Sequence, residues 1–310
     1  MDHFKAIFIF LFITSAITAY GQRKNGFDLS ESVIPVDQIM QGGPPKDGIP
    51  ALANPKFVSA SKVDFLKDDD KIIGVSINGE HKAYPIKILN YHEIVNDNLG
   101  GSPIVITYCP LCGSGIVFSA IIDSQVLHFG VSGLLYNSDV LMYDKETNSL
   151  WSQLMMQAVS GKLKEKEMMF LPSEHTKWQD WKERYPDTKV LSTNTGFPRD
   201  YNRKPYDGYT LTPTLYFPVQ HSSDAIPVKK QVLGVEVDGK FKAYSFTDLT
   251  KAGTSLLDSL NGVKYTIGFD SSNRSAKIIK SSKPIKYVTS YWFAWYTFHP
   301  DTEVYSSKQK

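Results

Sequence analysis

Residues 71–89, KIIGVSINGEHKAYPIKIL, recur as residues 231–249, QVLGVEVDGKFKAYSFTDL. In both stretches alternating apolar residues flank a two-residue turn, Asn78-Gly79 in the first and Asp238-Gly239 in the second. Such a pair is the strongest short-range signal of a β-hairpin, because the turn needs positive φ at both positions. The sequence therefore predicts two related units, each containing an antiparallel hairpin.

The likeness continues beyond the hairpins. Residues 99–108 match 260–269, and the tryptophans and Pro-Asp-Thr of 178–188 recur at 292–302. Turn signals and alternation in both copies predict mainly strands. We expect a β-dominated α+β fold, made of internally duplicated antiparallel β units with short helices.

Two of these helices are predicted in the first copy, around residues 86–96 and 178–184. That copy also has a long middle section, about residues 117–176, which the second has in shortened form. The expected organisation is a signal peptide (1–21), an N-terminal extension (22–69), a first β-rich unit (70–197), a Tyr/Pro-rich linker (198–229) and a second, degenerate unit (230–310).

The N-terminus has the pattern of an export signal. Lys5 precedes an apolar run at residues 6–13, and small residues follow at 19–21. We expect cleavage after Gly21 and a periplasmic or secreted mature protein. Since no other apolar stretch approaches the length of a membrane span, no stable span is expected after cleavage.

Composition and missing motifs exclude several functions. The net charge is only +2 and acids alternate with bases, which is unlike a surface that neutralises nucleic-acid phosphates. The chain has no glycine loop of the nucleotide-binding kind, no G-x-S-x-G and no H-E-x-x-H. We therefore expect no nucleic acid and no nucleotide, whereas a small-molecule or protein partner stays open.

The two cysteines of the chain lie in the string Cys109-Pro-Leu-Cys112-Gly113. Strands are predicted on both sides of the string, so no helix N-terminus is available to lower a thiol pKa as in thioredoxin-type sites. The string instead resembles half of a zinc ribbon, where proline and glycine aim both sulfurs at one ion. His92, on the short helix just before the cysteine-bearing strand, is the best candidate for a further ligand.

The second copy acts as an internal control. Asp270 and Asn273 stand opposite the cysteines, and Ala252 or Gly253 stands opposite the histidine. Because the thiols and the imidazole are lost together, we expect Cys109, Cys112 and His92 to form one site. Asp139 and Asp144, five residues apart on a predicted strand, are assigned to opposite faces and to the flanks of turns.

Three chemistries remain open for this site. Two thiolates and an imidazole suit copper(I) or zinc. Alternatively, Cys109 and Cys112 form a reversible disulfide, with His92 or Glu93 as proton acceptor. The third possibility is a non-catalytic binding module with a structural disulfide, which buried cysteines without a nearby histidine would favour. Whether the protein is an enzyme stays open.

Several strings resemble a known family of bacterial and archaeal exported proteins. They are H-E-I-V-N-D at His92–Asp97, Y-C-P-L-C-G at Tyr108–Gly113, and L-Y-N-S-D at Leu135–Asp139. The likeness also covers residues 178–192 and 199–209, and the family is catalogued as domain-of-unknown-function family three-one-seven-nine. The resemblance implies a shared site in these strings and assigns no activity to it.

Overall fold

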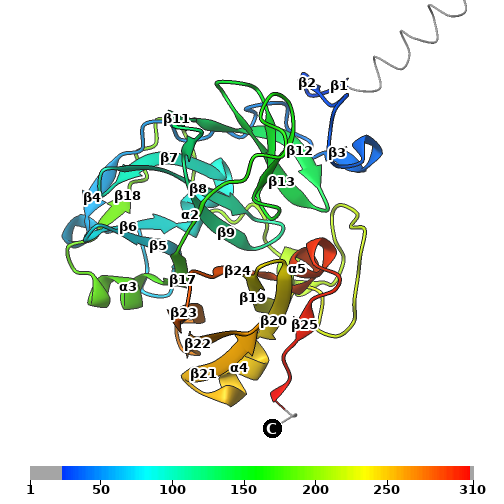
Figure 1. Cartoon of the computed structure of the whole chain (residues 1–310). Coiled ribbons are helices and arrows are strands. Elements are labelled where there is room, and N and C mark those ends of the chain that lie inside the picture. The colour runs from blue at the N-terminus through cyan, green and yellow to red at the C-terminus, as the bar shows by residue number, and fades with distance from the viewer. Residues whose placement is uncertain (1–22, 308–310) are drawn as a thin grey trace, which may run out of the picture.

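The computed structural model describes residues 23–307, so the predicted signal peptide and its cleavage after Gly21 lie outside the described residues. The described chain is dominated by β-structure, in small, mostly antiparallel sheets with a five-bladed, propeller-like arrangement (Figure 1). Four short α-helices connect the strands. Within residues 23–307 there is no helix of the length and hydropathy needed to cross a membrane.

The first unit begins with a mixed five-stranded sheet. In spatial order its strands are β17 (Ser173–Lys177), β5 (Lys71–Ile77), β6 (Glu80–Pro85), β18 (Lys189–Leu191) and β4 (Phe57–Ser59). The predicted hairpin is the β5–β6 pair. β18 is parallel to β6, because the chain passes through α3 (Trp178–Arg184) before it returns to the sheet. The all-antiparallel expectation is wrong at this strand.

A sheet of the second unit has the same arrangement. Its strands are β24 (Lys286–Tyr291), β19 (Gln231–Val237), β20 (Lys240–Ser245) and β25 (Glu303–Val304), and α5 (Trp292–Phe298) precedes β25. β25 is parallel to β20, as β18 is to β6. The register also agrees, because Gly74 lies opposite Ala83 and Gly234 opposite Ala243. This common topology is what an internal duplication predicts.

The recurring glycines make room for the recurring tryptophans. A Cβ atom on Gly74 would lie 2.3 Å from the ring of Trp181, and one on Gly234 would lie 2.2 Å from the ring of Trp295. Trp181 Nε1 donates a hydrogen bond to Thr188 Oγ1 at 2.9 Å, and Trp295 makes the same bond in the second unit. Each tryptophan thus fixes its helix directly on its sheet.

A second sheet completes each unit. In the first unit it contains β16 (Phe170–Leu171), β9 (Ser114–Ser119), β8 (Ser102–Cys109) and β7 (Ile94–Leu99), and in the second β21 (Ser255–Leu260), β22 (Val263–Asp270) and β23 (Ser275–Ser281). The preceding helices are α2 (Ile86–His92) and α4 (Phe246–Ala252). α2 is shorter than predicted, because Glu93 has a φ of 56° and the chain then enters β7.

The long middle section of the first unit forms a further sheet beside the two sheets just described (Figure 1). Its strands are β15 (Gln157–Ser160), β14 (Leu150–Ser152), β13 (Asp139–Asp144), β12 (Phe129–Tyr136) and β3 (Ile39–Gln41). Smaller elements are β1 (Arg23–Lys24), β2 (Phe27–Asp28), β10 (Ile121–Ile122), β11 (Gln125–Val126) and the 3₁₀ turns at Val36–Gln38, Ala60–Lys62 and Tyr209–Leu211. The N-terminal extension therefore adds a strand to each of two sheets.

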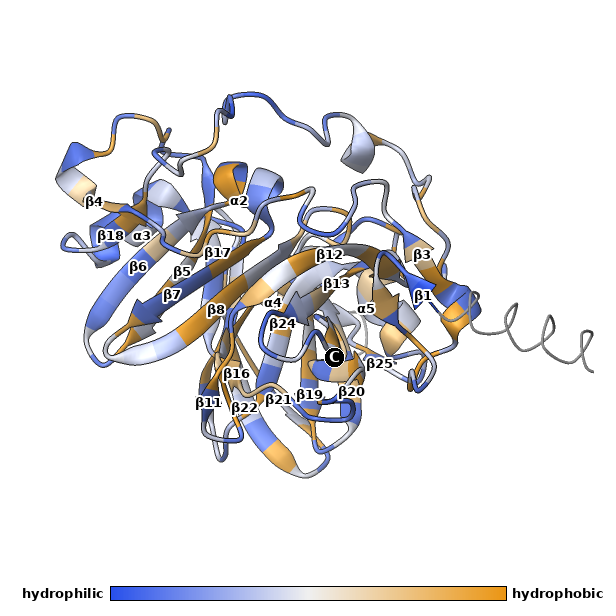
Figure 2. Cartoon of the chain, turned by 90° about the horizontal axis from the view of Figure 1, so that it is seen from above, coloured by the Kyte–Doolittle hydropathy of each residue, from blue (hydrophilic) through white to orange (hydrophobic). Residues whose placement is uncertain are grey.

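Residues 198–229, here called the strap, connect the two units and are tied to both. Gln220 N–H donates to Asn137 Oδ1 at 2.8 Å in the first unit, and Trp292 Nε1 of the second unit donates to Ser223 O at 2.9 Å. A core cluster joins residues of both units, the strap and the middle section. β8, which ends at Cys109, is mainly hydrophobic (Figure 2), and its Val105 and Cys109 belong to this cluster.

Candidate functional site

The two cysteines lie on a tight turn between β8 and β9, so the predicted strand-turn-strand arrangement is confirmed. Both are free thiols and at most 1% exposed. Gly113 has a φ of 59°, and a Cβ there would meet the ring of Tyr291 at 2.7 Å. Tyr291 N–H also donates to Cys112 O at 2.8 Å. The turn is therefore held against the second unit, and only glycine fits its end.

A second turn, between β12 and β13, reaches the same place. Asn137 and Ser138 both have positive φ, which turns the chain sharply so that Asp139 begins β13. The carbonyl oxygen of Ser138 accepts from Cys112 Sγ at 3.4 Å and from Cys109 Sγ at 3.7 Å. The L-Y-N-S-D and Y-C-P-L-C-G strings thus meet at the thiols.

Asp139 joins the cysteines in one buried group. One ligand atom from each of Cys109, Cys112 and Asp139 lies within 4.8 Å of the others, a spacing at which the group can hold a metal ion. Asp139 Oδ2 accepts from Leu154 N–H at 3.0 Å, whereas Oδ1 has no hydrogen-bond partner in residues 23–307. Asp144, on the opposite face, bonds Thr147 and Trp151. Both aspartates flank turns as predicted, and Asp139 in addition belongs to the buried group with the cysteines.

His92 lies outside this group and binds elsewhere through both ring nitrogens. Nδ1 donates to Pro50 O at 2.7 Å, and Nε2 lies 2.7 Å from Tyr201 Oη. Burial lowers the pKa of His92, so the ring is neutral and Nε2 accepts from the tyrosine. The imidazole therefore links the N-terminal extension to the strap, and Asp139 takes the third place that sequence reasoning gave to His92.

The site contains acidic groups without a balancing cation. Burial raises the pKa of Asp139 to about 7, and burial together with the nearby Asp139 raises that of Glu93 to about 8. Burial also raises the pKa of both thiols. Among the residues the structure describes, no lysine, arginine or histidine forms an ion pair with any of these groups. A bound cation would favour their ionised forms.

Cys109 opens onto a cavity of about 290 Å³. Glu93 also lines it, and the aromatic wall comes from the strap through Tyr206, Tyr216 and Phe217. The other lining residues are mostly apolar and come from the N-terminal extension, the cysteine turn and the β12–β13 hairpin. Of the three ligand-type residues, only Cys109 lines this cavity.

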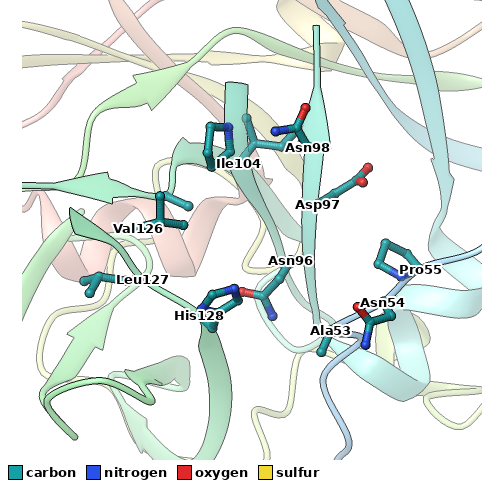
Figure 3. Close-up of a pocket in the computed structure, with 12 residues that line it drawn as sticks. Ala53, Asn54, Pro55, Asn96, Asp97, Asn98, Ile104, Val126, Leu127 and His128 are labelled. Atoms are coloured by element: carbon teal, nitrogen blue, oxygen red, sulfur yellow. The ribbon is translucent and has the colours of Figure 1, made fainter. Parts of the chain in front are cut away.

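A larger hollow of about 460 Å³ lies elsewhere, between β7 and residues 126–128 (Figure 3). Three of its polar residues already have partners. Asn96 bonds the backbone of Leu52 and Phe129, Asp97 pairs with Lys82, and His128 pairs with Glu146.

The chain matches the family model described as "Protein of unknown function (DUF3179)" over residues 46–283. It belongs to this family. The match contains the whole site, the strap and most of the second unit. No curated protein and no solved structure matches the chain significantly.

In this DUF3179 protein the three strings named from the sequence occupy distinct positions around one site. Y-C-P-L-C-G supplies the thiols, L-Y-N-S-D supplies Asp139, and H-E-I-V-N-D supplies Glu93 in the cavity wall and His92 behind it. Sequence reasoning missed Asp139, although it stands in one of these strings. The family resemblance of the L-Y-N-S-D string was the one sequence signal that could have pointed to Asp139.

The second unit keeps the turn and closes it with its own side chains. Asn273 Nδ2 donates to Asp270 Oδ2 at 2.8 Å, and Asp270 Oδ1 accepts from the N–H groups of Ser272 and Asn273. These bonds satisfy the carboxylate without an ion. The corresponding turn of the first unit instead places two free thiols beside an unpartnered carboxylate oxygen.

Proposed function

We propose that Cys109, Cys112 and Asp139 form a zinc-binding site. The observation that carries this proposal is the buried Asp139 carboxyl: one of its oxygens lies within 4.8 Å of a sulfur of each cysteine, and its Oδ1 has no hydrogen-bond partner in the described chain. A buried polar atom without a partner is costly, and a metal ion would remove that cost. The charge balance supports the same conclusion, because the acidic groups have no cationic partner among residues 23–307.

The ligand types favour zinc over copper(I). Zinc accepts thiolate and carboxylate ligands together, with bonds of about 2.3 Å to sulfur and about 2.0–2.2 Å to oxygen. Copper(I) prefers soft ligands, and the carboxylate of Asp139 is a hard one. Two thiols and a histidine would suit either copper(I) or zinc. With Asp139 in place of the histidine, the ligand set favours zinc.

The thiol-disulfide alternative has weaker support. A reactive dithiol needs a lowered thiol pKa, commonly from a cation or a helix N-terminus. Here burial raises the pKa of Cys109 and Cys112, and the turn between them leads into a strand. A site with these thiols is better suited to binding a cation than to rapid disulfide exchange.

Metal analysis of the purified protein tests the proposal. After dialysis against zinc under reducing conditions, the wild type should retain about one zinc ion, and a Cys109→Ser/Cys112→Ser variant should retain none. Asp139→Asn should weaken zinc binding at least as much as the roughly 10–100-fold cost of losing an outer-shell partner.

The second unit offers a matched control. Asp270→Asn changes the equivalent turn and should leave zinc binding unchanged. Equal zinc content in the wild type and the double cysteine variant would refute the site, and a loss of zinc in Asp270→Asn would show a non-specific effect of altering these turns. We further propose that the protein acts after export, on the basis of residues 1–21.

A further inference from the structure

The metal-binding group is closed on one side and open on the other. Cys112 and Asp139 are fully buried and do not line the cavity, whereas Cys109 does. Three protein ligands also leave one position of a tetrahedral zinc ion free, as in zinc sites that bind an exchangeable molecule. The cavity lies on the side of Cys109, so a molecule in it could supply the fourth ligand to an ion held by the group.

We propose that this cavity binds a small, mainly apolar molecule whose metal-coordinating oxygen or sulfur group occupies the free position, where it also hydrogen-bonds to Glu93. This inference rests on the proposed zinc site and adds the ligand class and the residue that recognises it. Three observations support it: the conformation of Glu93, its unused hydrogen-bonding capacity and the chemistry of the cavity walls.

The backbone of Glu93 has a conformation that side chains rarely adopt. Glu93 follows the last residue of α2, with φ 56° and ψ −34°. The equivalent residue after α4 is Gly253, with φ 95°, which is the residue type expected at such a helix end. The first unit therefore carries a glutamate where its counterpart carries glycine, at a conformational cost. Such costs concentrate at binding and catalytic sites.

The side chain of Glu93 also lacks a partner. It lines the cavity, its residue is 7% exposed, and no hydrogen bond to its carboxyl is found within the described chain. Its backbone is fixed by Glu93 N–H donating to Leu89 O and Tyr108 N–H donating to Glu93 O, both at 2.7 Å. The Glu93 carboxyl is thus held at the cavity wall with its hydrogen-bonding capacity unused, so that a molecule in the cavity can bond to it.

The side chains that line the cavity indicate the chemistry of the ligand's remaining, apolar part. Leu135 and Val140 form an aliphatic side, and the strap adds Tyr206, Tyr216 and Phe217. Tyr216 is 58% exposed, which places it where the cavity meets solvent. A ligand with a ring or short hydrocarbon body would pack between these surfaces with its polar group beside Cys109 and Glu93.

Cobalt-loaded protein and hydroxamate probes test this arrangement. Cobalt(II) replaces zinc and has a visible spectrum that changes when its coordination changes. Benzohydroxamate has a metal-binding head and an apolar ring, whereas acetohydroxamate has the head alone. We expect saturable spectral changes with both, and at least about tenfold tighter binding of benzohydroxamate, from burial of its ring.

Three variants separate the parts of the proposal. Glu93→Gln should keep cobalt and weaken both probes. Leu135→Trp, which fills the cavity, should keep cobalt and exclude benzohydroxamate. Tyr216→Ala changes an exposed side chain and should weaken benzohydroxamate while leaving acetohydroxamate unchanged.

The outcomes distinguish this inference from the proposed zinc site. Failure of the wild type to bind cobalt or zinc would overturn both. Normal cobalt binding without a spectral response to either probe would overturn the cavity proposal alone. So would equal affinity for benzohydroxamate in the wild type and in Glu93→Gln. If Leu135→Trp does not fold, the Tyr216→Ala comparison still decides whether the ring enters the cavity.

Discussion

The carbonyl oxygen of Ser138 accepts a hydrogen bond from Cys112 Sγ at 3.4 Å. The hydroxyl of the same residue donates to Phe217 O of the strap at 2.7 Å. One turn residue therefore connects the thiols with the segment that forms the aromatic wall of the cavity. Through this connection, the strap contributes to a site whose cysteines lie about a hundred residues earlier in the sequence.

The thiols should differ in reactivity in the metal-free protein. Cys109 lines the cavity, whereas Cys112 does not and is fully buried. Burial raises the pKa of both, so both should react more slowly with iodoacetamide than a free cysteine does. Mass spectrometry of partially alkylated protein should find Cys109 modified first, and zinc should protect both. Preferential labelling of Cys112 would contradict the cavity geometry.

His92→Ala should reduce stability and leave zinc binding intact. The substitution leaves Pro50 O without its partner and removes one of the two partners of Tyr201 Oη, which keeps its hydrogen bond with Thr195 Oγ1. Because unpaired buried groups are costly, we expect a loss of about 2–4 kcal/mol in the free energy of unfolding, measured with urea. Zinc content per folded molecule should stay near that of the wild type. Loss of zinc from a folded His92→Ala protein would restore the histidine as a ligand.

The stability of the metal-free protein should fall as the pH rises. The pKa of Asp139 is raised from 3.8 to about 7, and that of Glu93 from 4.5 to about 8. The folded state therefore binds more protons than the unfolded state between these values, and stability decreases from about pH 4 to pH 8. For the pair, these shifts correspond to an upper limit of about 9 kcal/mol.

Thermal unfolding of chelator-treated protein at several pH values measures this effect. An Asp139→Asn/Glu93→Gln variant should show a flatter pH dependence than the wild type, since neither amide titrates. Added zinc should stabilise the wild type most at the higher pH values, where its ligands lose protons more readily. Identical pH profiles in wild type and variant would show that these carboxyls do not determine the dependence.

Local pattern was enough to predict the hairpins and the strand-turn-strand setting of the cysteines. Asn78-Gly79 and Asp238-Gly239 specify their turns within a few residues, and Gly113 does so for the cysteine turn. The third residue of the buried group, Asp139, was not predictable in this way. Asp139 reaches the thiols only because the middle section packs beside the first unit, and alternation along a strand does not reveal what each face contacts.

The position of His92, outside the group of Cys109, Cys112 and Asp139, has a related explanation. His92, Cys109 and Cys112 have no counterparts in the second unit, and their joint absence was interpreted as one shared site. The contacts of His92 are with Pro50 and Tyr201, which belong to the N-terminal extension and the strap. The second unit therefore lacks both the cysteines and the histidine, although in the first unit these residues make separate contacts and do not bind one another.

Gly74→Ala should destabilise the first unit. The added Cβ would overlap the Trp181 ring, which is buried and held by its bond to Thr188. We expect the free energy of unfolding to fall by at least about 1–3 kcal/mol. Gly234→Ala should have a similar effect through Trp295. Combining Gly74→Ala with Trp181→Leu should cost less than the sum of the two single changes, and strict additivity would argue against the overlap.

Glu93→Gly should stabilise the protein and impair its site. Glycine adopts positive φ with little cost, and Gly253 after α4 also has positive φ; the substitution in addition removes a carboxyl without a partner in the described chain. Relief of both costs should raise the free energy of unfolding of the metal-free protein by about 1–3 kcal/mol.

Affinity of the cobalt-loaded variant for benzohydroxamate should fall, because the ligand loses its hydrogen-bonding partner. Parallel urea titrations and probe titrations measure the two effects, with Glu93→Gln as the control that keeps the side-chain shape and the backbone cost. A variant that is less stable than the wild type would show that Glu93 contributes to folding, whereas unchanged probe affinity would remove its assignment as a ligand-binding residue.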